Sequence, residues 1–277
     1  VLFRSPMLKS FISSLKVKGF DLVAPFCVQD YNQKVEVEHQ LPVLNQKNTL
    51  ALLIGNSRYL WPIFIKDLVD RNYEPNSSPN PLDEYTSLCI GDALKNIPVE
   101  SKCFFYFTKN GQHFIPFQRL AEIANLGVNS PRSHLCYSPV YSSWFGLRAV
   151  IIFDMDFKGA SLDPLSALTN TIDPEDDEKA KNLLAELMSS TNYRKEKSLD
   201  GVWRRWLSVR TLFREQKMPY TWNQAAYHYS KNQLYLKGDM DRMRNGTYKE
   251  SFDWIDDFNR DVMNYRRSEE RRVGKEC

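Results

Sequence analysis

The chain has 277 residues, of which 42% are apolar, and its formal net charge is +3. This length fits one large domain or two small ones, and the apolar content is enough for an ordinary core. No run is long and apolar enough to cross a membrane, so we expect no membrane partner. The small net charge gives no support to nucleic-acid binding, so we expect no nucleic-acid partner.

Both ends of the chain resemble translated sequencing adapters. Residues 1–5 read VLFRS and residues 267–277 read RSEERRVGKEC. These ends carry five of the 37 Lys and Arg residues and three of the 34 Asp and Glu residues, so the net charge without them is +1. We therefore expect a single domain over residues 6–266, which starts at Met7 or continues from residues further upstream.

The remaining cysteines form no C-x-x-C pair, and no signal peptide precedes them. They are Cys27, Cys89, Cys103 and Cys136. We interpret them as reduced thiols of an intracellular, cytoplasmic protein. The four histidines show no paired spacing of the kind that holds zinc, so we expect no metal site. They are His39, His113, His134 and His228.

The first third of the chain predicts helices that alternate with short strands. The expected elements are a helix over 8–17, a strand over 22–28, a strand over 49–54, and helices over 60–69 and 80–94. Gly19 ends the first helix. Pro25 marks an edge strand, because it has no N–H group to donate to a central ladder. Asn80 and Pro81 are typical of a helix start.

The rest of the chain predicts two further strands and a series of helices. These are a strand over 103–107, a helix over 115–126, a strand over 145–153, and helices over 199–213 and 222–236. Asn110-Gly111 predicts a turn. Asp173 precedes an acid-rich helix start that suits the helix dipole. A last short helix is expected from Phe252 onward.

The strand over 145–153 contains one cation, Arg148, within an otherwise apolar run. The run is typical of a strand that is buried on both faces. A buried guanidinium without a partner costs several kcal/mol, on the order of the penalty for any unpaired buried ion. Arg148 therefore pairs with an internal acid, extends its charged end to water, or faces a cavity where an anion binds.

Four blocks of the chain resemble the cblC-type cobalamin-processing family, also called the MMACHC family. The most specific is Cys136-x-x-Pro-x-x-x-x-Trp-Phe-x-x-Arg148 followed by an aliphatic strand. The other blocks cover residues 19–32, 80–98 and 203–236, and they include a Gly-Phe-acid motif at Gly19 and Trp-Arg-x-Trp at Trp203. With gaps, the resemblance extends over residues 19–236.

The resemblance implies an α+β fold of the flavin-reductase/nitroreductase-like type, with an antiparallel sheet flanked by helices. It implies base-off binding of cobalamin (vitamin B12) and removal of its upper ligand, which is the activity of a cyanocobalamin reductase and alkylcobalamin dealkylase. Cyanide would leave reductively with a reduced flavin (FMN or FAD), and alkyl groups would transfer to glutathione. The protein would be a cytoplasmic chaperone of cobalamin with a cblD-type adaptor as partner, and a monomer or ligand-induced homodimer.

The resemblance also assigns site residues, although no catalytic side chain among them. The cobalamin contacts of the family fall on Ile115, Pro116, Phe117, Gln118, Cys136 and Leu147. Its glutathione-binding arginine falls on Arg148, and a second lies one position from Arg210. Without the resemblance, Phe117 would be core, Gln118 a surface amide and Cys136 a buried thiol.

Three departures from the family pattern matter, and the lost arginine bears on glutathione transfer. Leu234 occupies the position of a further glutathione arginine, Glu122 replaces a histidine, and the segment 127–133 is far shorter than in the family. We therefore expect cobalamin binding to be better preserved than glutathione transfer. A non-catalytic cobalamin carrier and a flavin-dependent reductase of another substrate stay open as alternatives.

Overall fold

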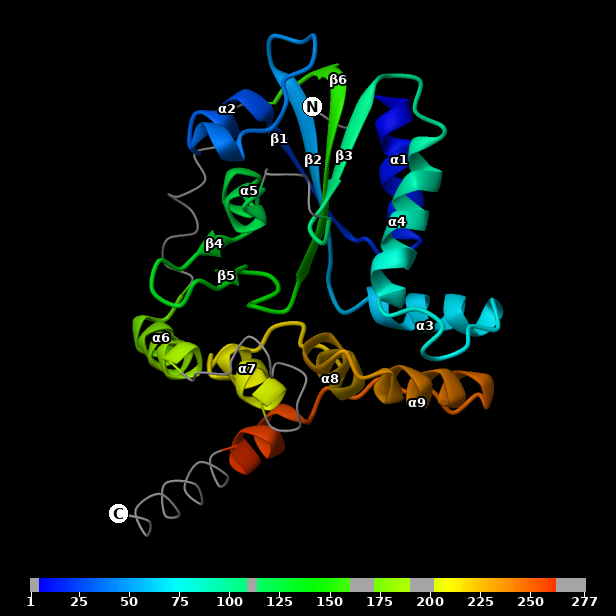
Figure 1. Cartoon of the computed structure of the whole chain (residues 1–277), viewed down its shortest axis with the longest axis vertical. Coiled ribbons are helices and arrows are strands. Elements are labelled where there is room, and N and C mark those ends of the chain that lie inside the picture. Colours follow the sequence, from blue (N-terminus) through cyan, green and yellow to red (C-terminus); the bar gives the residue numbers. More distant parts are fainter. Residues whose placement is uncertain (1–4, 109–113, 160–171, 190–201, 263–277) are drawn as a thin grey trace.

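The computed structural model describes residues 5–108, 114–159, 172–189 and 202–262 (Figure 1). Its centre is an antiparallel sheet of four strands in the order β1-β2-β6-β3. The strands are β1 (Leu22–Cys27), β2 (Thr49–Asn56), β6 (Gly146–Asp156) and β3 (Ser101–Phe105). The predicted antiparallel sheet flanked by helices is confirmed, and the predicted Asn110-Gly111 turn lies outside the described residues.

The order of the strands follows from their sequences. β2 is buried along its whole length and β6 along most of it, as expected for apolar runs in the middle of a sheet. β1 lies at an edge, as Pro25 predicted, because proline there leaves no central ladder hydrogen bond unmade. β3 forms the other edge, and it ends at Phe105, two residues before the predicted end.

Helices α1 (Pro6–Lys16), α3 (Leu60–Asp70) and α4 (Pro81–Leu94) pack on one face of the sheet, which we call the first face. From Ala149 to Phe153, every second residue of β6 points into this layer, as the alternation of a strand requires. The sheet contributes Leu50, Leu52, Ile54, Ala149, Ile151 and Phe153 to it. The predicted helices over 8–17, 60–69 and 80–94 are confirmed to within a few residues.

The opposite or second face is covered by α2 (Val28–Asn32) and α5 (Phe117–Ile123), with the short pair β4 (Val128–Asn129) and β5 (Cys136–Tyr137) beside them. A short 3-10 helix, η2 (Val37–His39), follows α2. The helix predicted over 115–126 is shorter than expected. Pro116 precedes its first residue, and Asn125 adopts a left-handed backbone with φ of 56° that stops it.

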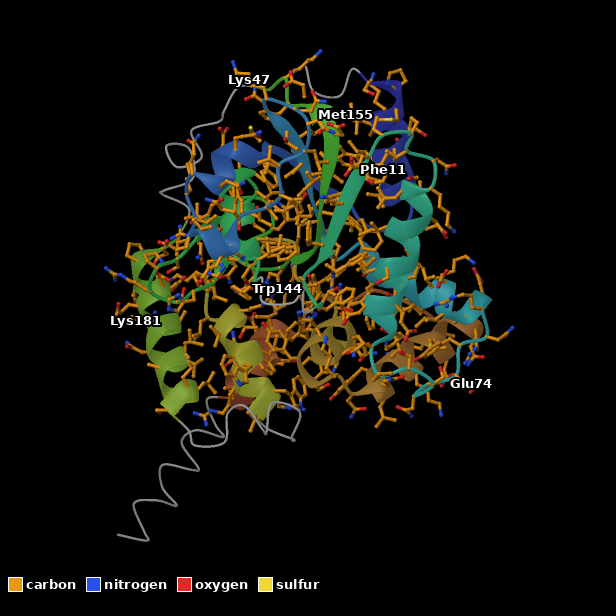
Figure 2. All side chains as sticks on the ribbon, turned by 45° about the horizontal axis from the view of Figure 1, so that its top comes forward. Phe11, Lys47, Glu74, Trp144, Met155 and Lys181 are labelled. Atoms are coloured by element: carbon orange, nitrogen blue, oxygen red, sulfur yellow. The ribbon has the colours of Figure 1, made fainter. Side chains whose placement is uncertain are left out.

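A third layer closes the end of the sheet where β6 begins (Figure 1). It consists of α6 (Pro174–Ser189), α7 (Val202–Thr211), α8 (Trp222–Ser230), α9 (Gln233–Arg244) and a helix over 255–262. Trp144 lies between this layer and the sheet (Figure 2). It is fully buried and packs in one cluster with Trp203 and Tyr220, so the Trp-Phe pair before β6 anchors the layer.

The single helix predicted over 222–236 is wrong, because the chain breaks it into α8 and α9. Lys231 takes a left-handed conformation with φ of 57°, which ends α8. The side chain of Asn232 then accepts a hydrogen bond from the N–H group of Leu234 and starts α9. The apolar periodicity continues across the break, which is why the sequence pattern did not show it.

Asp239 ties α9 to two other helices. Its buried carboxylate accepts hydrogen bonds from the indole Nε1 of Trp61 on α3 at 2.7 Å and from Asn223 on α8 at 2.9 Å. Arg242, one turn further along α9, donates to the same carboxylate at 2.7 Å. A buried carboxylate with this many donors positions all three helices relative to one another.

We predict that Asp239→Ala lowers the free energy of unfolding by about 2–4 kcal/mol, because the indole N–H group of Trp61 and its neighbours lose a buried acceptor. Urea unfolding measures this. Asp241→Ala is the matched control: Asp241 lies two residues away, pairs only with Arg244 at the surface, and should change stability by less than about 0.5 kcal/mol. Equal effects of the two changes would contradict the prediction.

Candidate functional site

Four of the predicted cobalamin contacts lie together on the second face of the sheet. Ile115 is buried in the core there, and Phe117, Cys136 and Leu147 pack against that core from α5, β5 and β6. Pro116 caps the start of α5 beside them and is half-buried. Gln118 is exposed, and its amide donates to the carbonyl of His134 at 2.8 Å. The structure therefore brings the apolar members of the set together.

A β-bulge places Leu147 on this face. Ile54 of β2 pairs with Ala149, but the next residue, Gly55, pairs with Leu147, so Arg148 is an extra residue with no partner on β2. Strict alternation would send Leu147 to the first face together with Ala149. The extra residue reverses that alternation, so that Leu147 shares the second face with Val150.

Two glycines make room for the bulge. A Cβ atom on Gly55 would lie 2.6 Å from the carbonyl oxygen of Gly146, closer than two such atoms can approach. A Cβ atom on Gly146 would lie 3.1 Å from the guanidinium of Arg148 and 3.0 Å from the side-chain oxygen of Asn56. Glycine at both positions therefore lets the Arg148 side chain fold back over the start of its own strand.

Arg148 is buried, with 2% of its surface exposed, and its described partners are neutral. Its Nε donates to Asn56 Oδ1 at 2.6 Å, and its guanidinium lies 5.7 Å from the ring centre of Tyr106. None of the ion pairs among the described residues includes it. Of the predicted alternatives, an ion pair with an internal acid therefore finds no support within the described part of the chain.

Arg210 on α7 lies in the same region and also has neutral partners. Its Nη1 donates to the carbonyl of Ser143 at 2.6 Å, and its guanidinium lies 5.9 Å from the ring of Trp144 and 5.7 Å from that of Tyr229. Both Arg210 and Arg148 act on the phenol of Tyr220, whose pKa burial raises and these two charges lower. The two arginines assigned from the sequence are therefore brought to one place.

A third cation, Lys231, lies at the junction of α8 and α9, where the residue is exposed but close enough to Arg148 for that charge to act on it. Desolvation lowers its pKa, Asp83 opposes that effect, and Arg148 adds to it. Its ammonium lies 5.9 Å from the ring centre of Tyr227 and belongs to none of the ion pairs of the described residues. We call Arg148, Arg210 and Lys231 the cation cluster.

His228 lies among these three cations and is neutral. Burial and then the charges of Lys231, Arg210 and Arg148 lower its pKa well below the ordinary value of 6.5. Its ring contacts Tyr220 and Tyr229, at 6.3 and 5.6 Å between ring centres. Desolvation is the main cause of this shift, and the positive charges of the three cations act in the same direction.

Several buried polar atoms beside the cation cluster have no hydrogen-bond partner. They are Arg210 Nε, the Tyr220 hydroxyl and Ser143 Oγ, although the Tyr220 hydroxyl still interacts with the guanidinium of Arg210 at longer range. An unpaired buried polar group costs about 1–3 kcal/mol, so such groups are rare in folded proteins and gather where a ligand completes them. Positive charge together with unpaired hydrogen-bonding groups indicates a binding site for a polar ligand that carries negative charge.

Cys136, at the edge of this region, is a neutral thiol. Burial raises its pKa to about 12, Glu122 acts in the same direction, and Arg210 opposes them. The thiolate is the reactive form of cysteine, so Cys136 is a packing residue in this state and not a nucleophile.

Sequence reasoning missed Lys231 and His228. Both lie in the block that resembles the cblC-type family, but the arginine sought there fell on Leu234, which is 71% exposed on α9. A local sequence signal for Lys231 was available. Ser230-Lys231-Asn232 ends one helix and supplies the N-cap residue of the next, and such a break points the side chain of Lys231 away from the helical pattern.

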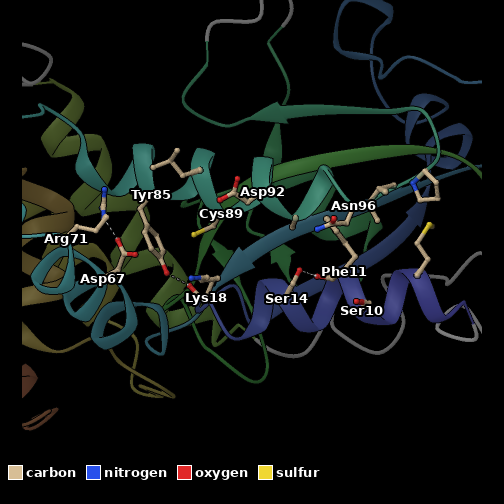
Figure 3. Close-up of a pocket in the computed structure, with 15 residues that line it drawn as sticks. Ser10, Phe11, Ser14, Lys18, Asp67, Arg71, Tyr85, Cys89, Asp92 and Asn96 are labelled. Carbon is tan, nitrogen blue, oxygen red and sulfur yellow. Dashed lines mark hydrogen bonds and ion pairs between the residues drawn. The ribbon is translucent and has the colours of Figure 1, made fainter.

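A separate groove of 690 Å³ lies between α1 and α4 on the first face (Figure 3). Its walls include Phe11 and Ser14 of α1 and Tyr85 and Cys89 of α4. Burial raises the pKa of Cys89, so this thiol is also neutral. None of the predicted site residues lines this groove, and it lies on the other side of the sheet from the predicted cobalamin contacts.

Two further features of the described residues bear on the class of site. No helix in this part of the chain has the length and apolarity needed to span a membrane. No group of three or more His, Cys, Asp or Glu side chains there is arranged to hold a metal ion.

Among the comparisons with known proteins, only the search of solved structures found a match, and it shows the fold alone. No protein-family model and no curated protein matches the chain. A solved structure does: that of a C. elegans B12-trafficking protein CblC, a homologue of human MMACHC, with a TM-score of 0.60 and 17% sequence identity. The match covers 83% of this chain and 94% of that one. The chain therefore has a CblC-like fold.

We predict that His228 makes folding stability depend on pH. Its pKa is lowered in the folded chain, so the unfolded chain takes up a proton below about pH 6.5 while the folded chain does not. The free energy of unfolding should then fall on acidification, by at most about 1.4 kcal/mol per pH unit from this group. Urea unfolding at pH 7.5 and pH 5.5 measures the difference.

His228→Phe keeps the ring contacts and should remove this share of the acid sensitivity. His134→Asn is the control: His134 is exposed and has a left-handed backbone that asparagine tolerates, so its replacement should leave the pH dependence unchanged. An acid sensitivity that is the same in His228→Phe and in the unaltered protein would show that His228 is not held neutral.

Proposed function

We propose that this protein binds cobalamin in the base-off form and removes its upper ligand. One observation carries the proposal: in a CblC-like fold, the predicted cobalamin contacts and the cation cluster meet where β6 begins. The solved structure with this fold is that of a B12-trafficking protein. The residues quoted for the resemblance and the site built by the fold therefore point to the same chemistry.

Cobalamin suits the apolar part of the site. Corrin is a broad, largely apolar disc with an amide rim, and such a ligand needs apolar walls with a few polar anchors. Ile115, Phe117, Cys136 and Leu147 would supply the walls on the second face. The Tyr220 hydroxyl and Ser143 Oγ have no partner of their own and would supply hydrogen bonds to rim amides.

The cation cluster suits a glutathione co-substrate for dealkylation. Arg148, Arg210 and Lys231 would bind its carboxylates, and their field would favour the thiolate over the thiol. The thiolate sulfur would attack the alkyl carbon, so that a C–S bond forms and the Co–C bond breaks with its electron pair left on cobalt. Lys231 adds a positive charge in the region where the family has an arginine and this chain has Leu234.

Reductive decyanation needs electrons, which a reduced flavin, FMN or FAD, would supply as co-substrate. The tyrosine rings around the cation cluster suit a planar ring system of this kind. Cys136 is held neutral by burial, so it would not be the electron donor. The positive potential at His228 would help to draw cyanide away as an anion.

Four finer assignments follow from the resemblance and remain proposals. They are a flavin-reductase/nitroreductase-like fold type, a cblD-type adaptor as partner, a cytoplasmic location, and an oligomeric state that is either a monomer or a ligand-induced homodimer. We also propose that residues 6–266 form one domain. The β1-β2-β6-β3 sheet and the layer of α6–α9 share the buried Trp144, which supports a single folding unit over these parts.

Titration with cyanocobalamin tests the central proposal. We expect the absorbance spectrum of cobalamin to change from the base-on to the base-off form, without added metal, as protein is added. Turnover with reduced flavin or glutathione then separates an enzyme from a non-catalytic carrier. An unchanged cobalamin spectrum at saturating protein would reject cobalamin binding, and flavin turnover without it would favour a reductase of another substrate.

Arg148→Lys tests the role of the cation cluster. Lysine keeps the charge but cannot hold a carboxylate bidentately, and it also loses the Nε contact with Asn56. A lost charge-assisted contact of about 1.5–3 kcal/mol corresponds to a roughly ten- to hundredfold weaker affinity for glutathione. Cobalamin affinity, measured by the same absorbance titration, should change little.

Arg71→Lys is the matched control, because Arg71 is exposed just after α3, pairs with Asp67 and lines the separate groove. Melting temperatures of both variants separate a local effect from unfolding. Unchanged glutathione affinity in a stable Arg148→Lys protein would show that Arg148 does not bind this ligand.

A further inference from the structure

Asn56, the last residue of β2, has a fully buried side chain whose two ends make different hydrogen bonds. Its Oδ1 accepts from the Nε of Arg148 at 2.6 Å, and its Nδ2 donates to the carbonyl of Ser57 at 2.8 Å. The second bond decides which end of the amide carries the oxygen, so the guanidinium meets a neutral acceptor. Asn56 lies outside the four blocks that resemble the cblC-type family.

The bond from Nε leaves the two Nη groups of Arg148 to other partners, and the described neighbours there are neutral. A Cβ atom on Gly146 would lie 3.1 Å from Nη2, so the absence of a side chain keeps this nitrogen uncovered. The ring of Tyr106 lies 5.7 Å from the guanidinium carbon, and its hydroxyl interacts with Arg148 at longer range. A carboxylate that approaches end-on, through both Nη groups, would find the bidentate geometry that arginine favours.

One carboxylate, that of Asp21, is connected to this arrangement through Ser57. Its two oxygens accept from the N–H group of Ser57 at 2.7 Å and from the Ser57 hydroxyl at 2.5 Å, while the Ser57 carbonyl accepts from Asn56. Burial raises the pKa of Tyr220, the two arginines lower it, and the charge of Asp21 raises it. Asp21 is thus part of the electrostatics of the site, but it orients the amide that holds Arg148 and forms no ion pair with that arginine.

An acid at position 56 is the usual solution for a buried guanidinium, because buried charges are normally paired. Aspartate has nearly the shape of asparagine, and its carboxylate would accept the same hydrogen bond from Nε. It would also neutralise Arg148 and leave less positive charge for a ligand. Asparagine holds the guanidinium at the same place and preserves its charge.

We infer that Asn56 is a positioning residue of the cation cluster, which fixes Arg148 with a neutral oxygen so that both Nη groups stay available to a ligand carboxylate. The inference rests on the proposed function, in which that carboxylate belongs to glutathione. It adds the residue that decides whether an internal acid or a bound anion balances the charge of Arg148. Asn56 acts through Arg148 and does not itself touch the ligand.

Asn56→Asp tests the inference, with glutathione titrated by calorimetry into the cobalamin-loaded protein. The new carboxylate should pair with Arg148 and weaken glutathione binding roughly ten- to hundredfold, as the loss of one charge-assisted contact implies. The base-off change of the cobalamin spectrum should persist and shows that the variant is folded. A merely structural asparagine would leave the glutathione affinity of the folded variant unchanged, and that result would overturn the inference.

Asn32→Asp is the matched control. The side chain of Asn32, at the end of α2, also donates to a carbonyl and accepts from an N–H group, both of Leu41 and both at 2.8 Å. The variant therefore introduces the same charge and loses the same kind of donor, but it has no arginine to neutralise. Its glutathione affinity should equal that of the unaltered protein, and an equal loss in both variants would contradict the inference.

Asn56→Ala decides the question if Asn56→Asp does not fold. It keeps the charge of Arg148 and removes the group that holds it, so that binding must immobilise one more side chain. We expect a loss of glutathione affinity of roughly a few- to tenfold, and an unchanged affinity would overturn the inference.

Failure of the proposed function is distinct from failure of this inference. Cobalamin would then keep its base-on spectrum with the unaltered protein, before any variant is made. Glutathione titrated into the cobalamin-free protein and into the Asn56 variants would still test whether Asn56 leaves Arg148 available to an anion. Absence of glutathione binding to the unaltered protein in both titrations would overturn the inference.

Discussion

The site depends on one extra residue in a strand. Arg148 has no partner on β2, and this bulge both turns Leu147 to the second face and directs a guanidinium toward the end of the sheet. Gly55 and Gly146 give it space, and Asn56 receives its Nε. The apolar walls and the cation cluster are therefore set by the same local irregularity, and neither would be in place on a regular strand.

Around this bulge, positively charged side chains lie close together and are contacted by neutral groups. Tyrosine rings, an asparagine oxygen and the carbonyl of Ser143 face the cations, where a protein built for stability alone would place carboxylates. Mutual repulsion among Arg148, Arg210 and Lys231 is a cost to the folded chain. The anionic ligand that we propose would relieve that cost, so binding and stability would be coupled at this site.

The sequence predicted elements that are governed by one local rule. The edge position of β1 followed from Pro25, and the buried strand β6 followed from its apolar run. The sequence did not predict the bulge. The alternation of side chains between the two faces of a strand is inferred from residue types, and one inserted residue changes the face to which its neighbours point without changing the composition. It also missed Lys231, since the break between α8 and α9 interrupts a helical pattern that continues on both sides. The resemblance identified Arg148 and nearly identified Arg210, but spatial neighbours from different helices are set by tertiary packing.

The backbone at Lys231 shows a compromise in evolutionary terms. Its left-handed conformation suits glycine or asparagine, and an ordinary side chain there costs roughly 1–2 kcal/mol. Selection for stability alone would therefore replace this lysine, and a drifting sequence would reach glycine easily. In the proposed site, the charge that Lys231 would offer to an anionic ligand would offset this cost, so stability would be given up for binding at this one residue.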